Sequence, residues 1–434
     1  DGKSDIFFGG AQGKQATIYL QNGNGFTKKS FSTIVADSIY EDASAVIGDF
    51  NGDRQNDLFV ASGSGQYAAN LIPRLYQGNA LTKSNLPETK GMNASVIKTI
   101  DYDKDGDLDV FIGNNSKSNS FGRMPDCYLM NNNKGVFTIV QGATFSSIGM
   151  VTDALVTDFN KDGTQDLIVV GEWMKPTFFA NSKGNFKDVT ESLLPGNHNG
   201  LWQSIAAFDI DHDGDQDYLL GNWGMNSKFK SSSEFPMKMY YDDFDTNGTF
   251  ETIVAIEKKG NYYPTMGLDE LVEEFSGMLK KKFNNYNSFA GKKVEEVFDP
   301  AMLEKAALYE VHNLKSGYLR NDKGKFTFVP FSNKMQVSPI TSFVESDFDG
   351  DGKNEVFAAG NYFGVTPFHS RFDGFSGALI KNQKTIYLGN QIGIDLSQKA
   401  VRHLDIIPFN GKKYLLVTIN NKKAEVYELP MNKN

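Results

Sequence analysis

The amino-acid sequence predicts an all-β fold, a seven-bladed β-propeller, with eight blades as the alternative. Three observations indicate this fold: an acidic nine-residue motif recurs at an interval near 50 residues, short alternating apolar runs flank it, and turn signals follow. Apolar residues make up 40% of the 434 residues and 42 glycines supply frequent turns, so we expect one large β domain spanning residues 1–434.

The acidic motif is clearest in two copies, at residues 101–109 and 209–217. In the first copy, Asp-Tyr-Asp-Lys-Asp-Gly-Asp-Leu-Asp is followed by the apolar run Val-Phe-Ile-Gly. Looser copies begin at Asp49, Asp158, Asp243 and Asp347. The copies that begin at residues 49, 101, 158 and 209 are 52, 57 and 51 residues apart, which is the size of a propeller blade.

The runs around each motif predict four strands per repeat. Residues 95–100 alternate in polarity before the motif at 101–109, and an apolar strand follows the motif. Farther along, Asn, Asp and Gly turns between alternating runs are typical of β-hairpins, at residues 18–26, 128–137, 177–186 and 318–326. One repeat is therefore strand A, acidic loop, strand B, long loop, strand C, tight turn and strand D.

Both ends of the sequence contain incomplete repeats. The opening Asp1-Gly-Lys-Ser-Asp5 matches the second half of the motif, so we expect the N-terminal part of a larger protein, with any signal or anchor, to precede it. Residues 404–417 resemble an A–B hairpin that has lost its acidic loop. We expect this hairpin to close the ring beside the N-terminal strands.

One interval between motifs is about twice the usual length, because 104 residues separate Asp243 from Asp347. Within it, Leu268, Leu271, Phe275 and Leu279 follow the spacing of an amphipathic helix. Farther on, the Asp-Pro pair at 299–300 combines an N-cap residue with a proline at the first helical position. The sequence therefore predicts a small helical insertion, residues 265–312, within one blade.

The acidic loops predict calcium binding. Carboxylates a few ångströms apart disfavour each other's ionised form, and a divalent cation removes this repulsion. Calcium takes six to eight oxygen ligands, which side chains at motif positions 1, 3, 5 and 9 and the backbone carbonyl of position 7 supply. An EF-hand loop has a glutamate at its twelfth position and is flanked by helices. Counted from Asp101, the twelfth residue is Ile112 and the flanks alternate like strands, which excludes an EF-hand. We expect about four to six calcium ions.

The candidate ligand positions are the first, third, fifth, seventh and ninth of each motif. They are Asp49, Asn51, Asp53, Gln55 and Asp57; Asp101, Asp103, Asp105, Asp107 and Asp109; Asp158, Asn160, Asp162, Thr164 and Asp166; Asp209, Asp211, Asp213, Asp215 and Asp217; Asp243, Asp245, Asn247, Thr249 and Glu251; and Asp347, Asp349, Asp351, Lys353 and Glu355. The first loop has Arg54 in place of glycine, and the fifth has an amide and a longer ninth ligand. We therefore expect the loops from Asp49 and Asp243 to bind calcium most weakly.

The motif with its following apolar strand and Gly-Asn resembles the FG-GAP/VCBS repeat proteins, whose calcium-bearing propellers include the head of integrin α subunits. The matching stretches are residues 101–114, 209–222 and 347–361. Residues 221–228 and 360–373 are similar to large surface VCBS proteins of Bacteroidetes. The resemblance implies an extracellular or cell-surface protein, and the Bacteroidetes group further implies an outer-membrane lipoprotein attached to an import or assembly complex.

Several function classes are excluded or disfavoured. The net charge of −9 and the lack of a basic stripe exclude nucleic acid as a partner. The sequence contains no run of 18 apolar residues, so it predicts no membrane-spanning segment. The five histidines form no pair with metal-ligand spacing, and no hydrolase or phosphate-loop motif occurs. We therefore expect no catalytic residues and a non-enzymatic protein-binding or scaffold module. A carbohydrate-binding or carbohydrate-active propeller, such as a lectin, lyase or glycosidase, is the alternative.

The partner surface is expected on the face opposite the acidic loops or on the helical insertion. Aromatic and arginine side chains dominate protein interfaces and sugar sites. The candidates in the loops of that face are Trp173, Trp202, Trp223, Tyr362, Phe363 and Arg371. Packing of these side chains under their own loops or in the central channel is the alternative.

Overall fold

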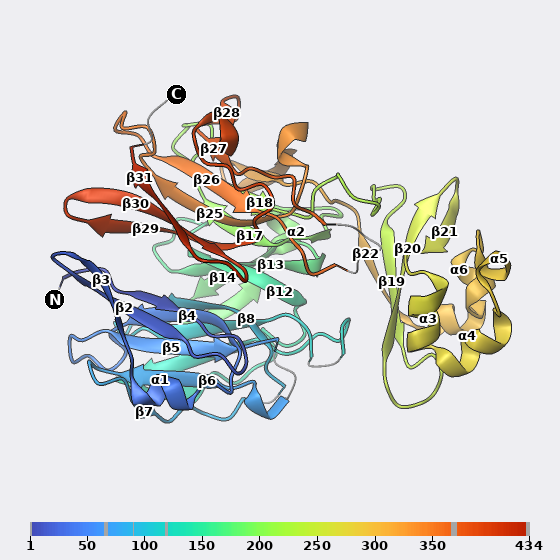
Figure 1. Ribbon diagram of the computed structural model, residues 1–434, viewed down its shortest axis with the longest axis horizontal. Helices are drawn as coiled ribbons and strands as arrows, with labels where there is room; N and C mark the ends of the chain where they lie inside the picture. The colour runs from blue at the N-terminus through green and yellow to red at the C-terminus, as the bar shows by residue number, and fades with distance from the viewer. Residues whose placement is uncertain (1, 65–67, 90, 118–119, 366–370, 431–434) are drawn as a thin grey trace.

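The protein is an all-β molecule made of many small antiparallel sheets with few, short helices (Figure 1). The computed structural model describes residues 2–64, 68–89, 91–117, 120–365 and 371–430. Within these residues, the strands form eight sheets. Seven of them follow one another along the chain and are numbered here in that order, and the eighth, called the inserted sheet, interrupts the fifth.

The first four sheets use consecutive strands. The first contains β1 (Ile6–Phe8), β2 (Thr17–Asn22) and β3 (Gly25–Lys29), and the second contains β4 (Asp42–Gly48), β5 (Asp57–Ser62), β6 (Pro73–Gln77) and β7 (Thr82–Ser84). The third contains β8 (Ala94–Ile100), β9 (Asp109–Asn114), β10 (Tyr128–Asn133) and β11 (Val136–Ile139). The fourth contains β12 (Met150–Thr157), β13 (Asp166–Met174), β14 (Thr177–Ser182) and β15 (Asn185–Asp188), and β16 (Gly200–Leu201) also pairs with β13.

The remaining three sheets of the series follow the same order, apart from the interruption. The fifth contains β17 (Ser204–Ala207), β18 (Tyr218–Gly221), β23 (Gly317–Asp322) and β24 (Lys325–Pro330). The sixth contains β25 (Ile340–Ser346), β26 (Glu355–Gly360), β27 (Ala378–Ile380) and β28 (Ile386–Leu388), and the seventh contains β29 (Val401–Phe409), β30 (Lys412–Ile419) and β31 (Glu425–Leu429). Two short helices, α1 (Ser32–Ala36) and α2 (Thr190–Leu193), lie in the connections.

The core lies between consecutive sheets. Every residue of β5, β9 and β26 is buried, because both faces of these strands pack against a neighbouring sheet. Separate apolar clusters join each sheet of the series to the next. The first and seventh sheets also meet: Gln21 Nε2 donates to the carbonyl of Pro408 at 2.7 Å, and the rings of Phe26 and Phe409 are 5.8 Å apart. The series of sheets therefore returns to its starting point.

The first strands of successive sheets are joined by side chains at a shared irregularity. β4, β8, β12, β25 and β29 each contain a register shift near their start, typical of a β-bulge. At this place the hydroxyl of Ser95 donates to the carbonyl of Val151 at 2.6 Å, and that of Thr152 donates to the carbonyl of Trp202 at 2.8 Å. These hydrogen bonds link one sheet to the next.

The inserted segment lies between β18 and β23 and projects from one side of the molecule (Figure 1). Its sheet contains β19 (Met237–Asp242), β20 (Glu251–Lys258), β21 (Asn261–Pro264) and β22 (Ala307–Val311). Its helices are α3 (Leu268–Glu274), α4 (Ser276–Lys282), α5 (Tyr286–Phe289), α6 (Val294–Val297) and α7 (Pro300–Lys305). The helical segment predicted at 265–312 is thus the second half of a longer excursion, and the Asp243 motif lies in the inserted sheet, between β19 and β20.

The inserted sheet is covered on both faces. Phe275 and Leu279 of the helical part pack with Phe244 and Ile253 in one apolar cluster. Met237 and Met239 of β19 belong instead to a cluster with residues of the sheet series, including Trp173 and Trp223. The inserted sheet therefore lies between its own helices and the body of the protein. No helix in the described part of the chain is long and apolar enough to cross a membrane.

Candidate metal centres

Each acidic motif joins the first two strands of its sheet, and its ninth residue is fixed by backbone hydrogen bonds. In the third sheet, Asp109 accepts from the N–H of Tyr102 at 3.2 Å and from the N–H of Asn132 at 2.8 Å. Asp217 accepts in the same way from Ile210 at 3.1 Å and Asn321 at 2.7 Å. The ninth carboxylate therefore ties the loop to the hairpin of the third strand.

The first aspartate of each motif organises the turn. Asp209 accepts from the N–H groups of Asp213 and Gly214 at 3.2 and 3.0 Å, and Asp158 accepts from Gly163 at 2.8 Å. The sixth position has positive φ, where glycine is favoured, as at Gly214 with φ 91°. Arg54 occupies this position in the first loop with φ 67°, at a cost of about 1 kcal/mol.

Four loops bring carboxylate oxygens together within 4.8 Å of one another. The groups are Asp101, Asp103 and Asp109; Asp209, Asp211 and Asp217; Asp243, Asp245 and Glu251; and Asp347, Asp349 and Asp351. In the two other loops an amide stands among the carboxylates: Asn51 donates to Asp53 at 3.2 Å, and Asn160 donates to Asp162 at 3.0 Å. The carbonyl oxygens of these two amides accept from the backbone N–H groups of Asp53 and Asp162, each at 2.9 Å.

The seventh-position carboxylates point away from these groups. Asp107 accepts from the N–H of Lys134 at 3.0 Å, and Asp215 lies 2.6 Å from the Lys161 ammonium. This leaves the backbone carbonyl of the seventh residue to serve as a ligand.

Burial changes the acidity of the ninth residue. Desolvation, with a smaller contribution from neighbouring carboxylates, raises the pKa of Asp109 to about 7 and those of Asp166 and Asp217 to about 6. Without a cation, the Asp109 carboxyl is therefore partly protonated near neutral pH, whereas Asp166 and Asp217 are mostly ionised. A divalent cation would favour the ionised form, because it places positive charge beside the carboxylate.

An ammonium group that sequence reasoning missed lies against the loop that begins at Asp347. Lys381 Nζ lies 2.6 Å from Asp349, 3.2 Å from Asp351 and 3.2 Å from Glu355. Hydrogen bonds to these carboxylates, chiefly Asp349, raise the pKa of Lys381. The signal that could have revealed it is the strand pairing, because Lys381 follows Ile380, which pairs with Val356 next to Glu355.

The half-motif at the N terminus has the geometry of a ninth position. Asp5 accepts from the N–H of Gln21 at 2.9 Å, as Asp109 does from Asn132. Asp1 lies outside the described residues.

The three tryptophans predicted as partner contacts are buried. Trp173, Trp202 and Trp223 are 5%, 0% and 8% exposed. Trp202 packs 5.6 Å from the ring of Phe328, and Trp223 packs 5.3 Å from that of Tyr362. Trp173 and Trp223 both contribute to the cluster that holds the inserted sheet. In this structure they are packing residues, which was the alternative that the sequence left open.

Among the predicted partner contacts, Phe363 and Arg371 are more accessible than the three tryptophans. Phe363 is half-buried and Arg371 is exposed. The Arg371 guanidinium lies 5.0 Å from the centre of the Phe363 ring, within range of a cation–π interaction.

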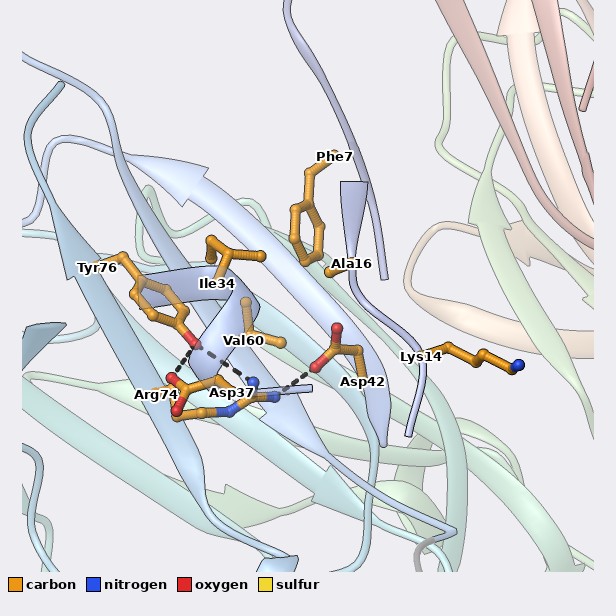
Figure 2. Close-up of a pocket in the computed structure, with 9 residues that line it drawn as sticks. All are labelled: Phe7, Lys14, Ala16, Ile34, Asp37, Asp42, Val60, Arg74 and Tyr76. Carbon is orange, nitrogen blue, oxygen red and sulfur yellow. Dashed lines mark hydrogen bonds and ion pairs between the residues drawn. The ribbon is translucent and has the colours of Figure 1, made fainter. Parts of the chain in front are cut away.

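A small pocket between the first and second sheets is lined by an internal ion pair. Figure 2 shows the Arg74 guanidinium directed at Asp42, 2.5 Å away, and the Tyr76 hydroxyl donating to Asp37 at 2.6 Å. Burial raises the pKa of Tyr76, which keeps the phenol neutral. The second oxygen of Asp42 accepts from the N–H of Gly10 at 2.8 Å. These contacts fasten the first sheet to the second, which gives the pocket a structural role.

Comparisons with known proteins agree with the repeat. The FG-GAP-like repeat family matches residues 1–60, 101–169 and 158–220. No curated protein matches the chain significantly. Among solved structures, the Vibrio cholerae biofilm matrix protein Bap1 is 10% identical with a TM-score of 0.41, over 98% of this chain and 87% of that chain. Saccharomyces cerevisiae Sqt1 is 11% identical with a TM-score of 0.46, over 99% and 94%. Likenesses at this level carry no argument about function.

Proposed function

The chain is an FG-GAP repeat protein, and from this premise we propose that it is a calcium-stabilised β-propeller that acts as a binding or scaffold module rather than as an enzyme. The observation that carries the proposal is the recurrence of one carboxylate group in the third, fifth, inserted and sixth sheets. Its ninth residue is held by the same backbone hydrogen bonds in the third and fifth sheets. A feature that every repeat needs for its own stability is expected to recur, whereas a site for one substrate is expected once.

We propose that the seven sheets of the series are the blades. Consecutive sheets share apolar clusters, and the first and seventh sheets meet through Gln21 and Pro408, which supports a closed ring. The inserted sheet is placed outside the ring because it packs on the cluster around Trp223 rather than between two sheets of the series.

The donor set of the loops fits calcium. The ligands are carboxylate, amide and carbonyl oxygens, which hard cations prefer, and calcium tolerates irregular geometry better than magnesium does. Within the described residues, one buried oxygen of Asp101 and one of Asp211 have no hydrogen-bond partner. Such oxygens are costly unless a cation or a proton satisfies them. We propose calcium in the loops from Asp49, Asp101, Asp158, Asp209 and Asp243.

The same argument supports a location outside the cytoplasm. Extracellular calcium is millimolar, a concentration that suits loops of modest affinity. We propose an extracellular or cell-surface protein that binds a protein partner, such as an outer-membrane import or assembly complex. The exposed Arg371 beside Phe363 and the outer surface of α3 to α7 are the proposed contact regions.

Two experiments test the proposal. The calcium content of the purified protein, measured after equilibration in a calcium buffer, should be several ions per chain and should fall by one in Asp103→Ala. Chemical cross-linking on intact cells should place partner cross-links on the inserted segment or near Arg371. Calcium-free protein that is stable would refute the first part, and cross-links confined to the acidic loops would refute the second.

A further inference from the structure

The loop at residues 347–355 differs from its counterparts in what neutralises its carboxylates. The Lys381 ammonium lies within 3.2 Å of three carboxylates, those of Asp349, Asp351 and Glu355. The carboxylates of Asp349 and Glu355 are only 5% and 3% exposed, so water contributes little to their solvation. An ammonium has three donor hydrogens, one for each of these acceptors.

The position of Lys381 is a fixed place in the repeat. It stands across from the ninth motif residue, one step beyond the pair that joins Val356 to Ile380. The residues at this place in the second to sixth sheets are Gln77, Asn131, Ala180, Arg320 and Lys381. Three of them are neutral, and Arg320 is exposed.

The third sheet shows what a neutral residue does at this place. Asn131 donates to Asp103 at 3.0 Å, which leaves the negative charge of the loop in place. Residues 101–109 contain five aspartates and one lysine, a formal charge of −4. Residues 347–355 contain four acidic residues and one lysine, and Lys381 brings their formal charge from −3 to −2.

The ammonium and a calcium ion would compete for the same oxygens. Calcium binds carboxylate oxygens at about 2.3 to 2.6 Å, and Lys381 Nζ already lies 2.6 Å from Asp349. Two cations that share the buried oxygens of Asp349 and Glu355 would repel each other, because burial weakens the screening by water.

We propose that Lys381 is the built-in cation of the loop at 347–355, so that this loop holds its carboxylates together without calcium. The inference rests on the proposed function in one respect, that calcium is the cation such loops would take. The sixth sheet therefore keeps its loop ordered when calcium is low.

The test is the calcium content of matched variants of the whole chain, equilibrated at one free calcium concentration. Lys381→Met should bind one more calcium ion per chain than the parent protein. Adding Asp349→Ala to this variant should remove the extra ion, whereas Asp349→Ala alone should leave the parent's calcium content unchanged. Arg320→Met, at the same place in the fifth sheet, should also leave the content unchanged.

A second variant keeps the test informative if Lys381→Met fails to fold. Lys381→Gln copies the residue found at this place in the second sheet, Gln77, and should gain the same ion. Unchanged calcium content in both Lys381 variants would overturn the inference, as would loss of an ion from the parent on Asp349→Ala alone.

The same set of variants also tests the proposed function separately. Asp103→Ala should remove one ion from the parent protein. If this variant loses no calcium while Lys381→Met gains an ion, the proposed function fails and the inference stands. If Asp103→Ala loses an ion and Lys381→Met gains none, the inference fails alone.

Discussion

The loops at residues 101–109 and 347–355 share one framework and differ in the group opposite the ninth residue. In both, the ninth carboxylate accepts from the N–H of the second residue, Tyr102 at 3.2 Å and Phe348 at 2.9 Å. Across the hairpin stands a neutral amide, Asn131, in one case and the ammonium of Lys381 in the other. The framework thus requires positive charge near the carboxylates, and we propose that calcium supplies it in one loop and a lysine in the other.

The largest expected effect comes from removing calcium altogether. Ligands that bind only the native state raise its stability by RT ln(1 + [L]/Kd) for each site. Excess EDTA should therefore lower the melting temperature by about 5 °C or more. Circular dichroism melts with and without calcium check this prediction, and magnesium in place of calcium serves as the control. A shift of only a degree would mean that the loops are neutralised by other means.

Substitution of the ninth residue should separate the two loops. Asp109→Asn should destabilise the protein by about 1 to 3 kcal/mol in calcium and less in EDTA, where a pKa of about 7 leaves the carboxyl partly neutral near pH 7. Glu355→Gln should cost a similar amount in both buffers, because it breaks the contact with Lys381. Urea unfolding in the two buffers measures the difference. Equal calcium dependence in both variants would contradict the comparison.

A smaller contrast is expected within one loop. Asp103 belongs to the carboxylate group, whereas the Asp107 side chain accepts from the N–H of Lys134. Asp103→Ala should therefore weaken calcium binding at least tenfold, equivalent to about 1.4 kcal/mol. Asp107→Ala should change it by less than about half that energy, and isothermal titration calorimetry distinguishes the two. Equal losses would show that the seventh side chain is a ligand after all.

The smallest effect on stability is expected at the proposed partner surface. Arg371 is exposed, so Arg371→Ala should change unfolding by less than about 0.5 kcal/mol. The same variant should weaken partner capture by about 1 to 3 kcal/mol if this side chain is an interface anchor. Capture of the cross-linked partner by parent and variant protein provides the measurement. Undiminished capture would shift attention to the inserted segment.

Much of the framework could be predicted from local sequence. The recurrence of the motif, its place between two strands and the hairpins after it depend on short-range patterns, and the strain at Arg54 follows from a missing glycine. The inserted sheet was missed because the Asp243 motif resembles any other repeat. Its start only 34 residues after Asp209, well short of the usual spacing, was the available signal.

Other features depend on contacts that a linear reading does not contain. Lys381 reaches its loop only through the pairing of β26 with β27, and nothing in its own neighbourhood marks it. Trp173 and Trp223 break the repeat as a binding site would, yet they are buried because the inserted sheet packs on them. A unique residue in a repeat therefore indicates a unique contact, which can lie inside the molecule.

The central claim is tested most directly by a crystal structure grown in calcium, with anomalous diffraction to identify the ions. We expect anomalous peaks within about 2.3 to 2.6 Å of the carboxylates in the loops from Asp101, Asp158 and Asp209. In the loop from Asp347 we expect no such peak and the Lys381 ammonium beside the carboxylates. Loops from Asp101 and Asp209 without calcium, or a calcium ion beside Asp349 with Lys381 turned away, would contradict it.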